Sequence, residues 1–264
     1  MSMKVLAIDS SGLVASVALA EDEVLRAEFT INDKKTHSQT LLPMLDQLRQ
    51  MTGLELDTVD AVAVAAGPGS FTGLRIGSAT AKGLGLALGK PLVEVPTLEA
   101  LAYNLYGTDR LVCPMMDARR NQVYTGLYEY VGKGRAMSES GSPGTPGTAR
   151  DIWGRDSYEL RVLQDQCAVE VAQIVEQCNR LGREVIFLGD GVPVYLEQIR
   201  ERISVPYALA PAHVNRQRAG SVAALGVVYA SRGQTVDAAL HQPLYLRKSQ
   251  AEREREEADD HTRA

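Results

Sequence analysis

The sequence has few cysteines, and no two of them stand at metal-binding spacing. Cys113, Cys167 and Cys178 are the three present, and none belongs to a Cys-x-x-Cys motif. This spacing excludes a zinc ribbon and gives no support to a disulfide framework. We therefore expect free thiols that pack as small apolar side chains in a reducing compartment.

Positive charge and long apolar runs are also scarce. Asp and Glu number 33 against 28 Lys and Arg, so the formal net charge is -5. A protein that binds RNA alone usually has a basic surface, and this balance argues against autonomous RNA binding. No apolar run reaches the length of a membrane span, and the chain opens without a charged leader region. We expect a cytoplasmic protein with no membrane partner.

Hydrophobic periodicity and turn residues predict two successive α/β lobes. Three strands are predicted close together at 3–9, 13–20 and 23–31, followed by a helix and then alternating strands and helices through residue 106. A second series opens with strands at 111–116 and 122–130, and a helix is predicted at 165–181. The repeated order predicts the duplicated, actin-like α/β fold of sugar kinases, heat-shock ATPases and actin.

This pattern also predicts the domain boundaries. We expect a first lobe at 1–108, completed by a helix at 216–232, a smaller second lobe at 109–215, and a C-terminal tail at 233–264. Glycine, serine and proline at 132–147 predict a flexible loop. Alternating charges near the end of the chain predict a solvated, fraying tail.

Three turns are candidates for facing a nucleotide. Asp9-Ser10-Ser11 closes the first strand, where exposed amides suit phosphate oxygens. Gly67-Pro68-Gly69-Ser70 leads into a helix N-terminus, which favours anions, although no Gly-Lys-Ser/Thr of a Walker loop follows. Gly189-Asp190-Gly191 follows a strand of the second lobe. An ordinary turn explains the first better, and the other two equally well.

The helix predicted after the second turn has small residues at every fourth position, namely Gly73, Gly77, Ala81, Gly85 and Gly89. This stripe winds by only about 40° per step. Each interior glycine costs roughly 1 kcal/mol relative to alanine, so the stripe needs a compensating contact. Close approach by another helix, either the one that carries Leu41, Leu45 and Leu48 or one of a second chain, is the interpretation we favour. Packing against the protein's own sheet is the alternative.

Several ordered motifs resemble the TsaB family, also called YeaZ. They lie at residues 3–11, 36–43, 67–77 and 117–124, and the end of the chain at 245–252 is similar as well. The resemblance implies an actin-like fold and a part in making threonylcarbamoyladenosine in tRNA. In that pathway the paralogue TsaD transfers threonylcarbamoyl from an adenylate to the adenosine beside the anticodon, helped by the ATPase TsaE.

The resemblance also implies where catalysis would be found. TsaD holds its metal with a helical His-x-Glu-Gly-His motif, and the order of elements places that motif at Thr97-Leu98-Glu99-Ala100-Leu101. Leucine cannot ligate a metal, and threonine with glutamate is a poor transition-metal site. The four histidines are too scattered to form an i, i+4 pair, and Cys113 has no histidine close in sequence.

We therefore expect a non-catalytic dimerisation or scaffold subunit, with no catalytic residue, no metal and no intrinsic cofactor. ATP or ADP at the interface of the complex is the one candidate ligand. TsaD is the expected heterodimer partner, TsaE a further member, and tRNA is bound only through the complex. A homodimer is expected when the chain is alone. The open alternatives are a nucleotide-dependent actin-like ATPase and a metalloprotease-like enzyme.

The expected partner interface is a pair of helices. It consists of His37 near a helix start, three leucines of one helix, and the small stripe with its neighbours on the other: Leu41, Leu45, Leu48, Gly73, Ile76, Gly77, Thr80, Ala81 and Leu84. If this surface is correct, a bulky residue at Gly77 or Ala81 leaves the fold intact and abolishes binding of TsaD.

Overall fold

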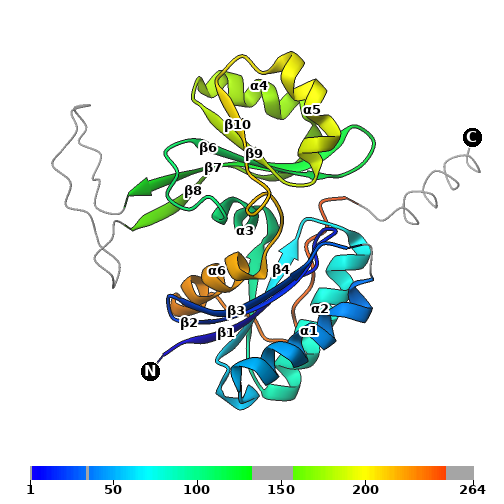
Figure 1. Ribbon diagram of the computed structural model, residues 1–264, viewed down its shortest axis with the longest axis vertical. Helices are drawn as coiled ribbons and strands as arrows, with labels where there is room; N and C mark the ends of the chain where they lie inside the picture. Colours follow the sequence, from blue (N-terminus) through cyan, green and yellow to red (C-terminus); the bar gives the residue numbers. More distant parts are fainter. Residues whose placement is uncertain (1, 34–35, 133–156, 248–264) are drawn as a thin grey trace, which may run out of the picture. The chain divides into compact units, whose positions relative to one another are not determined.

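The computed structural model describes residues 2–33, 36–132 and 157–247 (Figure 1). The loop predicted at 132–147, except its first residue, and the tail from 248 onward lie outside the described residues. The chain divides into two compact units: the described residues of Met1–Ala100 with Gln217–Ala264, and those of Leu101–Arg216. The division falls after Ala100 and not after residue 108, because Tyr103 and Tyr106 pack on Tyr130 within the second unit.

The first unit is built on a five-stranded sheet in the order β3-β2-β1-β4-β5. The three N-terminal strands are antiparallel, whereas β4 and β5 run parallel to β1. All seven residues of β4 are buried, as expected for a strand covered on both faces. The strand bounds are β1 (Lys4–Asp9), β2 (Ala15–Glu21), β3 (Val24–Ile31), β4 (Ala61–Gly67) and β5 (Leu92–Pro96).

Helices cover both faces of this sheet. α1 (His37–Thr52) and α2 (Phe71–Leu88) lie on one face, and α6 (Ala219–Ser231) lies on the other (Figure 1). α6 therefore belongs to the first unit although it follows the second unit in sequence. The short 3-10 helix η1 (Leu56–Thr58) precedes β4, and α3 (Thr97–Tyr103) follows β5.

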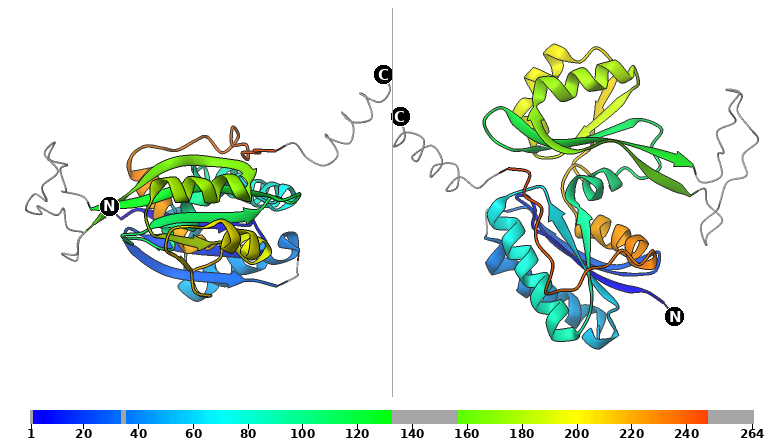
Figure 2. Two further views of the ribbon diagram at one scale, coloured as in Figure 1. Left: turned by 90° about the horizontal axis from the view of Figure 1, so that it is seen from above. Right: turned by 180° about the vertical axis from the view of Figure 1, so that it is seen from behind.

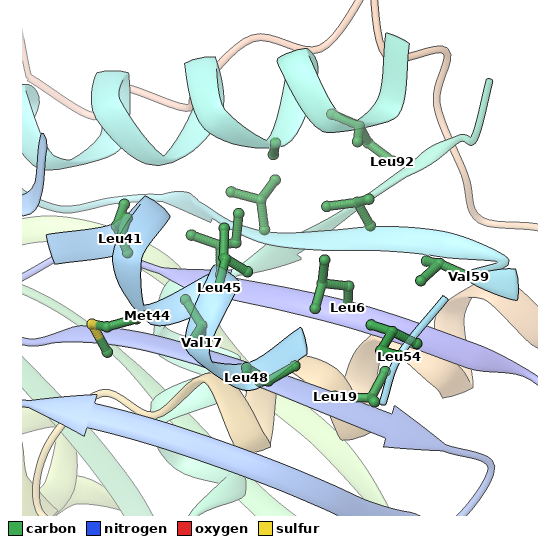
Figure 3. Close-up of a cluster of buried hydrophobic side chains, with 14 of the residues drawn as sticks. Leu6, Val17, Leu19, Leu41, Met44, Leu45, Leu48, Leu54, Val59 and Leu92 are labelled. Atoms are coloured by element: carbon green, nitrogen blue, oxygen red, sulfur yellow. The ribbon is translucent and has the colours of Figure 1, made fainter. Parts of the chain in front are cut away.

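The leucines of α1 belong to the core of this unit. Leu41, Leu45 and Leu48 are buried in one cluster with Leu6 and Val17 of the sheet (Figure 3). Their spacing along the sequence predicts a place for these three leucines at a partner interface. That assignment is wrong, because the amphipathic face of α1 is used to cover its own sheet.

The small stripe of α2 also faces its own unit. A β-carbon at Gly73 would collide with the carbonyl oxygen of Ser10, and one at Gly77 with the Ser10 hydroxyl. Ala81 is completely buried, and a β-carbon at Gly85 would lie 2.7 Å from the Ala238 methyl. Atoms of the protein's own unit therefore fill the space beside these residues. The assignment of Gly73, Gly77 and Ala81 to a partner interface is wrong.

The other three predicted interface residues of α2 are half-buried. Ile76 and Leu84 pack against the core of the first unit. Thr80 donates a hydrogen bond to the Ile76 carbonyl at 2.9 Å. These three residues lie at the margin of the buried face of α2.

The second unit repeats the plan of the first. Its sheet has the order β10-β9-β6-β7-β8, with β6, β7 and β8 antiparallel and β9 and β10 parallel to β6. This duplicated arrangement is the predicted actin-like α/β fold. The bounds are β6 (Leu111–Asp117), β7 (Gln122–Gly132), β8 (Tyr158–Glu170), α4 (Val171–Leu181), β9 (Val185–Leu188), α5 (Gly191–Arg202) and β10 (Tyr207–Leu209).

Two details of the second unit bear on the sequence predictions. Residues 165–170 continue β8 and pair with β7, so the helix predicted from 165 begins only at Val171. All three cysteines are free, with Cys113 and Cys178 buried. No helix among the described ranges has the length and apolar character needed to cross a bilayer.

An ordered segment follows α6 where the sequence predicted only a tail. We call Val236–Tyr245 the C-terminal strap. It pairs with β5, because the backbones of Leu92 and Val236 exchange two hydrogen bonds of 2.9 Å. It then runs along α2 toward Ala66, whose carbonyl accepts from the Leu244 amide at 2.7 Å (Figure 2).

The buried stripe of α2 generates a stability prediction. Gly73→Ala should lower the free energy of unfolding by about 1–3 kcal/mol or more, because its methyl group collides with a backbone oxygen that cannot rotate away. Gly83→Ala is the control on the same helix. That glycine has no atom within 4 Å of the added carbon, so alanine should stabilise by up to roughly 1 kcal/mol. Urea unfolding of both variants measures the two free energies of unfolding. Equal changes in the two variants would contradict the burial of the stripe.

Candidate functional site

The turn after β1 lies at the sheet edge where the parallel strands β1 and β4 both end. Asp9 Oδ1 accepts hydrogen bonds from the Ser11 amide at 2.9 Å and the Ser11 hydroxyl at 2.7 Å. The Ser10 hydroxyl donates to the Gly73 carbonyl of α2 at 2.9 Å. The turn is therefore fixed both by its own carboxylate and by the first turn of α2.

Several buried polar atoms beside this turn have no hydrogen-bond partner among the described residues. They are Asp9 Oδ2, His37 Nδ1 and both side-chain atoms of Gln217. His37 Nε2 donates to the Gly12 carbonyl at 2.9 Å, and a β-carbon at Gly12 would meet Gln217 at 2.7 Å. The His37 and Gln217 side chains lie beside Gly12, and Asp9 opens the same turn. Water or a small polar ligand at this turn would satisfy the four atoms.

Burial dominates the electrostatics of this turn. It raises the pKa of the Asp9 carboxyl, against the lowering effect of the Ser11 hydrogen bonds and of nearby His37. His37, which the sequence assigned to a partner interface, is half-buried and tied to its own β1 turn. Its imidazole position is explained by the contact with Gly12.

Two amides of the Gly67-Pro68-Gly69-Ser70 turn donate hydrogen bonds within the chain. The Gly67 amide donates to Thr97 Oγ1 at 3.1 Å, and the Ser70 amide donates to the Ser11 carbonyl at 2.7 Å. A β-carbon at Gly69 would collide with the Ser11 oxygen. The glycines are explained by close backbone approach, so the structure favours the tight-turn interpretation over a phosphate cradle.

The equivalent turns of the second unit also make hydrogen bonds within the chain. Asp117 ends β6, and its Oδ1 accepts from the Arg119 amide at 2.8 Å and the Tyr195 hydroxyl at 2.9 Å. Burial and this carboxylate raise the pKa of Tyr195 to about 12. The Gly189 amide donates to the Asn215 carbonyl at 3.0 Å. Asp190 is half-buried, and its Oδ1 has no hydrogen-bond partner among the described residues. Desolvation raises the pKa of its carboxyl.

The structure also brings together a serine, a histidine and a carboxylate that sequence reasoning missed. His241 Nδ1 lies 2.6 Å from Glu94 Oε1, and His241 Nε2 lies 2.9 Å from Ser78 Oγ. In the neutral ring, Nδ1–H donates to the carboxylate and Nε2 accepts from the serine. The order matches a catalytic triad, but Ser78 and His241 are buried, so substrate has no access. No local sequence signal links residues so far apart.

The exposed face of the α1–α2 pair is different from the face that the sequence predicted. On α2 it carries Ala79, Gly83 and Ala87, again four residues apart. The same helix pair exposes two large apolar side chains, Leu42 of α1 at 58% and Leu86 of α2 at 59%. We call these five residues the outer helix face.

Comparison with known proteins now identifies the family. Residues 24–255 match the family model described as TsaD, tRNA N6-adenosine threonylcarbamoyltransferase. The chain is 31% identical over 250 residues to the tRNA threonylcarbamoyladenosine biosynthesis protein TsaB of Bacillus subtilis, covering 95% of this chain and 96% of the relative. The chain belongs to the TsaD family and, within it, to the TsaB proteins. The TsaB protein of Escherichia coli is 30% identical over 253 residues, or 94% of this chain and 96% of its own.

Solved structures show the same relationship. The crystal structure of YeaZ from Pseudomonas aeruginosa superposes with a TM-score of 0.69 at 27% identity, covering 92% of this chain and all of that one. Another structure from the same organism, described as similar to peptidase YeaZ, gives a TM-score of 0.73 at 27% identity, with 93% and 100% coverage. The TsaB-type fold therefore extends over both units.

Helix α3 carries the segment that the resemblance sets against the metal-binding motif of TsaD. Thr97 and Leu101, the residues expected at the positions of the two histidines, are both buried. Thr97 Oγ1 already accepts a hydrogen bond from the Gly67 amide, and the Glu99 carboxylate accepts one from the Tyr229 hydroxyl. In the described part of the chain, no three His, Cys, Asp or Glu residues are arranged to hold a metal. The donor set at α3 is therefore unsuited to TsaD-type metal chemistry.

The raised pKa of Asp9 generates a pH prediction. A carboxyl whose pKa is raised on folding binds more protons when folded, so its contribution to stability is lost as pH rises above 3.8 and through the raised value. Asp9→Asn should therefore be more stable than the unmodified protein at pH 7, and the difference should vanish below pH 3.8. Urea unfolding at several pH values measures this.

The exposed Asp57 provides the control for this experiment. Asp57→Asn should leave the free energy of unfolding within about 0.5 kcal/mol at each pH. A loss of stability in Asp9→Asn at pH 7 would show instead that the charged carboxylate is needed by the fold.

Proposed function

We propose that this protein is the non-catalytic partner of a TsaD-type transferase in the synthesis of threonylcarbamoyladenosine in tRNA. The observation that carries the proposal is full-length similarity to proteins named for that biosynthesis. Thr97 and Leu101, at the positions where the resemblance to TsaD would place metal ligands, support it. The chemistry then belongs to TsaD, with TsaE as ATPase. The acidic chain contacts tRNA only through the complex.

The outer helix face supports docking of a helical partner. Gly83 lies inside α2, where glycine costs roughly 1 kcal/mol relative to alanine, yet its own unit has no atom near the missing β-carbon. A partner that packs its backbone there would supply the compensating contact. Ala79 and Ala87 extend this small surface by one turn on either side, and Leu42 and Leu86 add apolar area.

The unpartnered atoms around Gly12 favour a second candidate, a nucleotide or cation at the β1 turn, as in an actin-like ATPase. Asp9 Oδ2 and the Gln217 amide are its specific support. ATP turnover by the isolated chain, lost in Asp9→Ala, would establish this activity. ATP turnover only in the presence of TsaE would assign it to the complex.

The scaffold role predicts that formation of modified tRNA needs this protein, although the protein alone does not catalyse the reaction. TsaD, TsaE, tRNA and the threonylcarbamoyl donor, mixed with this protein, should form modified tRNA much faster than without it. This protein alone with tRNA and the donor should form none. Mass spectrometry of digested tRNA measures the product, and product made by the isolated chain would contradict the assignment.

The docking surface predicts a specific loss of binding. Gly83→Leu should weaken TsaD binding by at least about tenfold, because the side chain occupies the space of the partner backbone. Its fold should be unchanged, since no atom of its own unit is displaced. Calorimetric titration with TsaD measures the affinity, and circular dichroism the fold.

Glu176→Leu is the matched control, since it adds the same side chain at an exposed position of α4 in the second unit. It should bind TsaD normally. Unchanged binding by Gly83→Leu would remove the outer helix face as the docking surface. Loss of a homodimer without loss of TsaD binding would assign the face to self-association.

A further inference from the structure

The C-terminal strap is held down by polar contacts along its whole length. Lys82 of α2 donates to the carbonyls of Ala239 at 2.9 Å and His241 at 3.0 Å. His241 uses both ring nitrogens, one on Glu94 of β5 and the other on Ser78 of α2. The strap is thus fixed to the helix and the strand that it lies between, although it has no regular secondary structure of its own.

The outer side of the strap is apolar. Leu240 is 76% exposed, Leu244 45% and Tyr245 37%. The ring of Tyr245 lies 4.8 Å from that of Phe71 at the start of α2, and the Arg75 guanidinium lies 4.2 Å above the Phe71 ring. Three large apolar side chains within six residues are therefore held at the surface by a rigid base.

The strap extends the outer helix face. α2 lies between α1 on one side and the strap on the other, as the contact of Gly85 with Ala238 and the hydrogen bonds of Lys82 require (Figure 2). Lys82, the neighbour of Gly83 in sequence, holds the carbonyl of Ala239, so a partner seated on Gly83 has the exposed Leu240 of the strap close by. Tyr245 lies against Phe71 at the start of the same helix. Burying these side chains removes apolar surface from water, which is the dominant favourable term in association.

We propose that the C-terminal strap is a third docking element for the TsaD-type partner, and that Ser78, His241 and Glu94 are positioning residues that hold it in place. This inference rests on the proposed function, since it names a further part of the same interface. The occupant follows from continuity with the outer helix face. A second copy of this chain and residues 248–264 are the other occupants that the experiment distinguishes.

The first arm of the test changes the apolar side of the strap. Leu240→Asp and Leu244→Asp should each weaken TsaD binding by at least about tenfold, without changing the unfolding midpoint. Leu209→Asp, on β10 of the second unit, is the control with similar exposure to Leu244, and it should bind normally. Calorimetric titration of the full chain with TsaD measures all three.

The second arm tests positioning by His241. His241→Ala should speed hydrogen exchange at the amides of Val236 and Leu244, and it should weaken TsaD binding. Combined with Leu240→Asp, its effect on affinity should be much less than additive, because a released strap no longer presents that side chain. A merely structural role predicts additive losses, and additive losses would overturn the positioning role.

Gly83→Leu separates this inference from the function on which it rests. If Gly83→Leu abolishes TsaD binding while both strap variants bind normally, the strap proposal is overturned and the proposed function stands. If all three bind normally, the proposed docking function fails. Strap variants that only abolish a homodimer overturn the proposal in favour of a second copy. Tighter TsaD binding after removal of residues 248–264, with normal binding by the strap variants, overturns it in favour of that segment.

Discussion

The contact between the β1 turn and the glycines of α2 determines much of the first unit. The carbonyl oxygens of Ser10 and Ser11 occupy the space that side chains would fill at Gly73 and Gly69. This close approach brings the N-terminus of α2 against the end of β1. It also lets the Ser70 amide donate a hydrogen bond to the Ser11 carbonyl. The same contact therefore orients α2 and closes the turn that resembled an anion site.

As a consequence, α2 has two faces lined by small residues, one buried and one exposed. The inner one, at Gly73, Gly77 and Ala81, is filled by its own β1 turn and core. The outer one, at Ala79 and Gly83, is exposed. Because α2 is fixed from below by β1 and from one side by the strap, its outer face is presented in a single orientation. That rigidity reduces the ordering cost of binding and supports a docking role.

Sequence reasoning predicted the elements better than their partners. Strand alternation and turn residues predicted the two repeated sheets, because these signals are local, whereas the family was indicated by the resemblance of several ordered motifs. The four-residue stripe of α2 identified a face for close packing, but periodicity cannot say which backbone fills it. The helix predicted from 165 failed since pairing with β7 extends β8 to Glu170. The strap and the His241–Ser78 contact depend on residues 163 apart and leave no local pattern.

An exposed glycine is a better indicator of a foreign contact than a buried series of them. Glycine inside a helix is unfavourable, and at Gly73 the chain's own backbone explains it completely. At Gly83 nothing within 4 Å explains it, so the cost is left uncompensated in the isolated unit. The same reasoning applies to Leu240, which stands exposed on a segment pinned by a buried histidine. Both features are unfavourable for a free protein, and both become favourable when a partner covers the α1, α2 and strap surface.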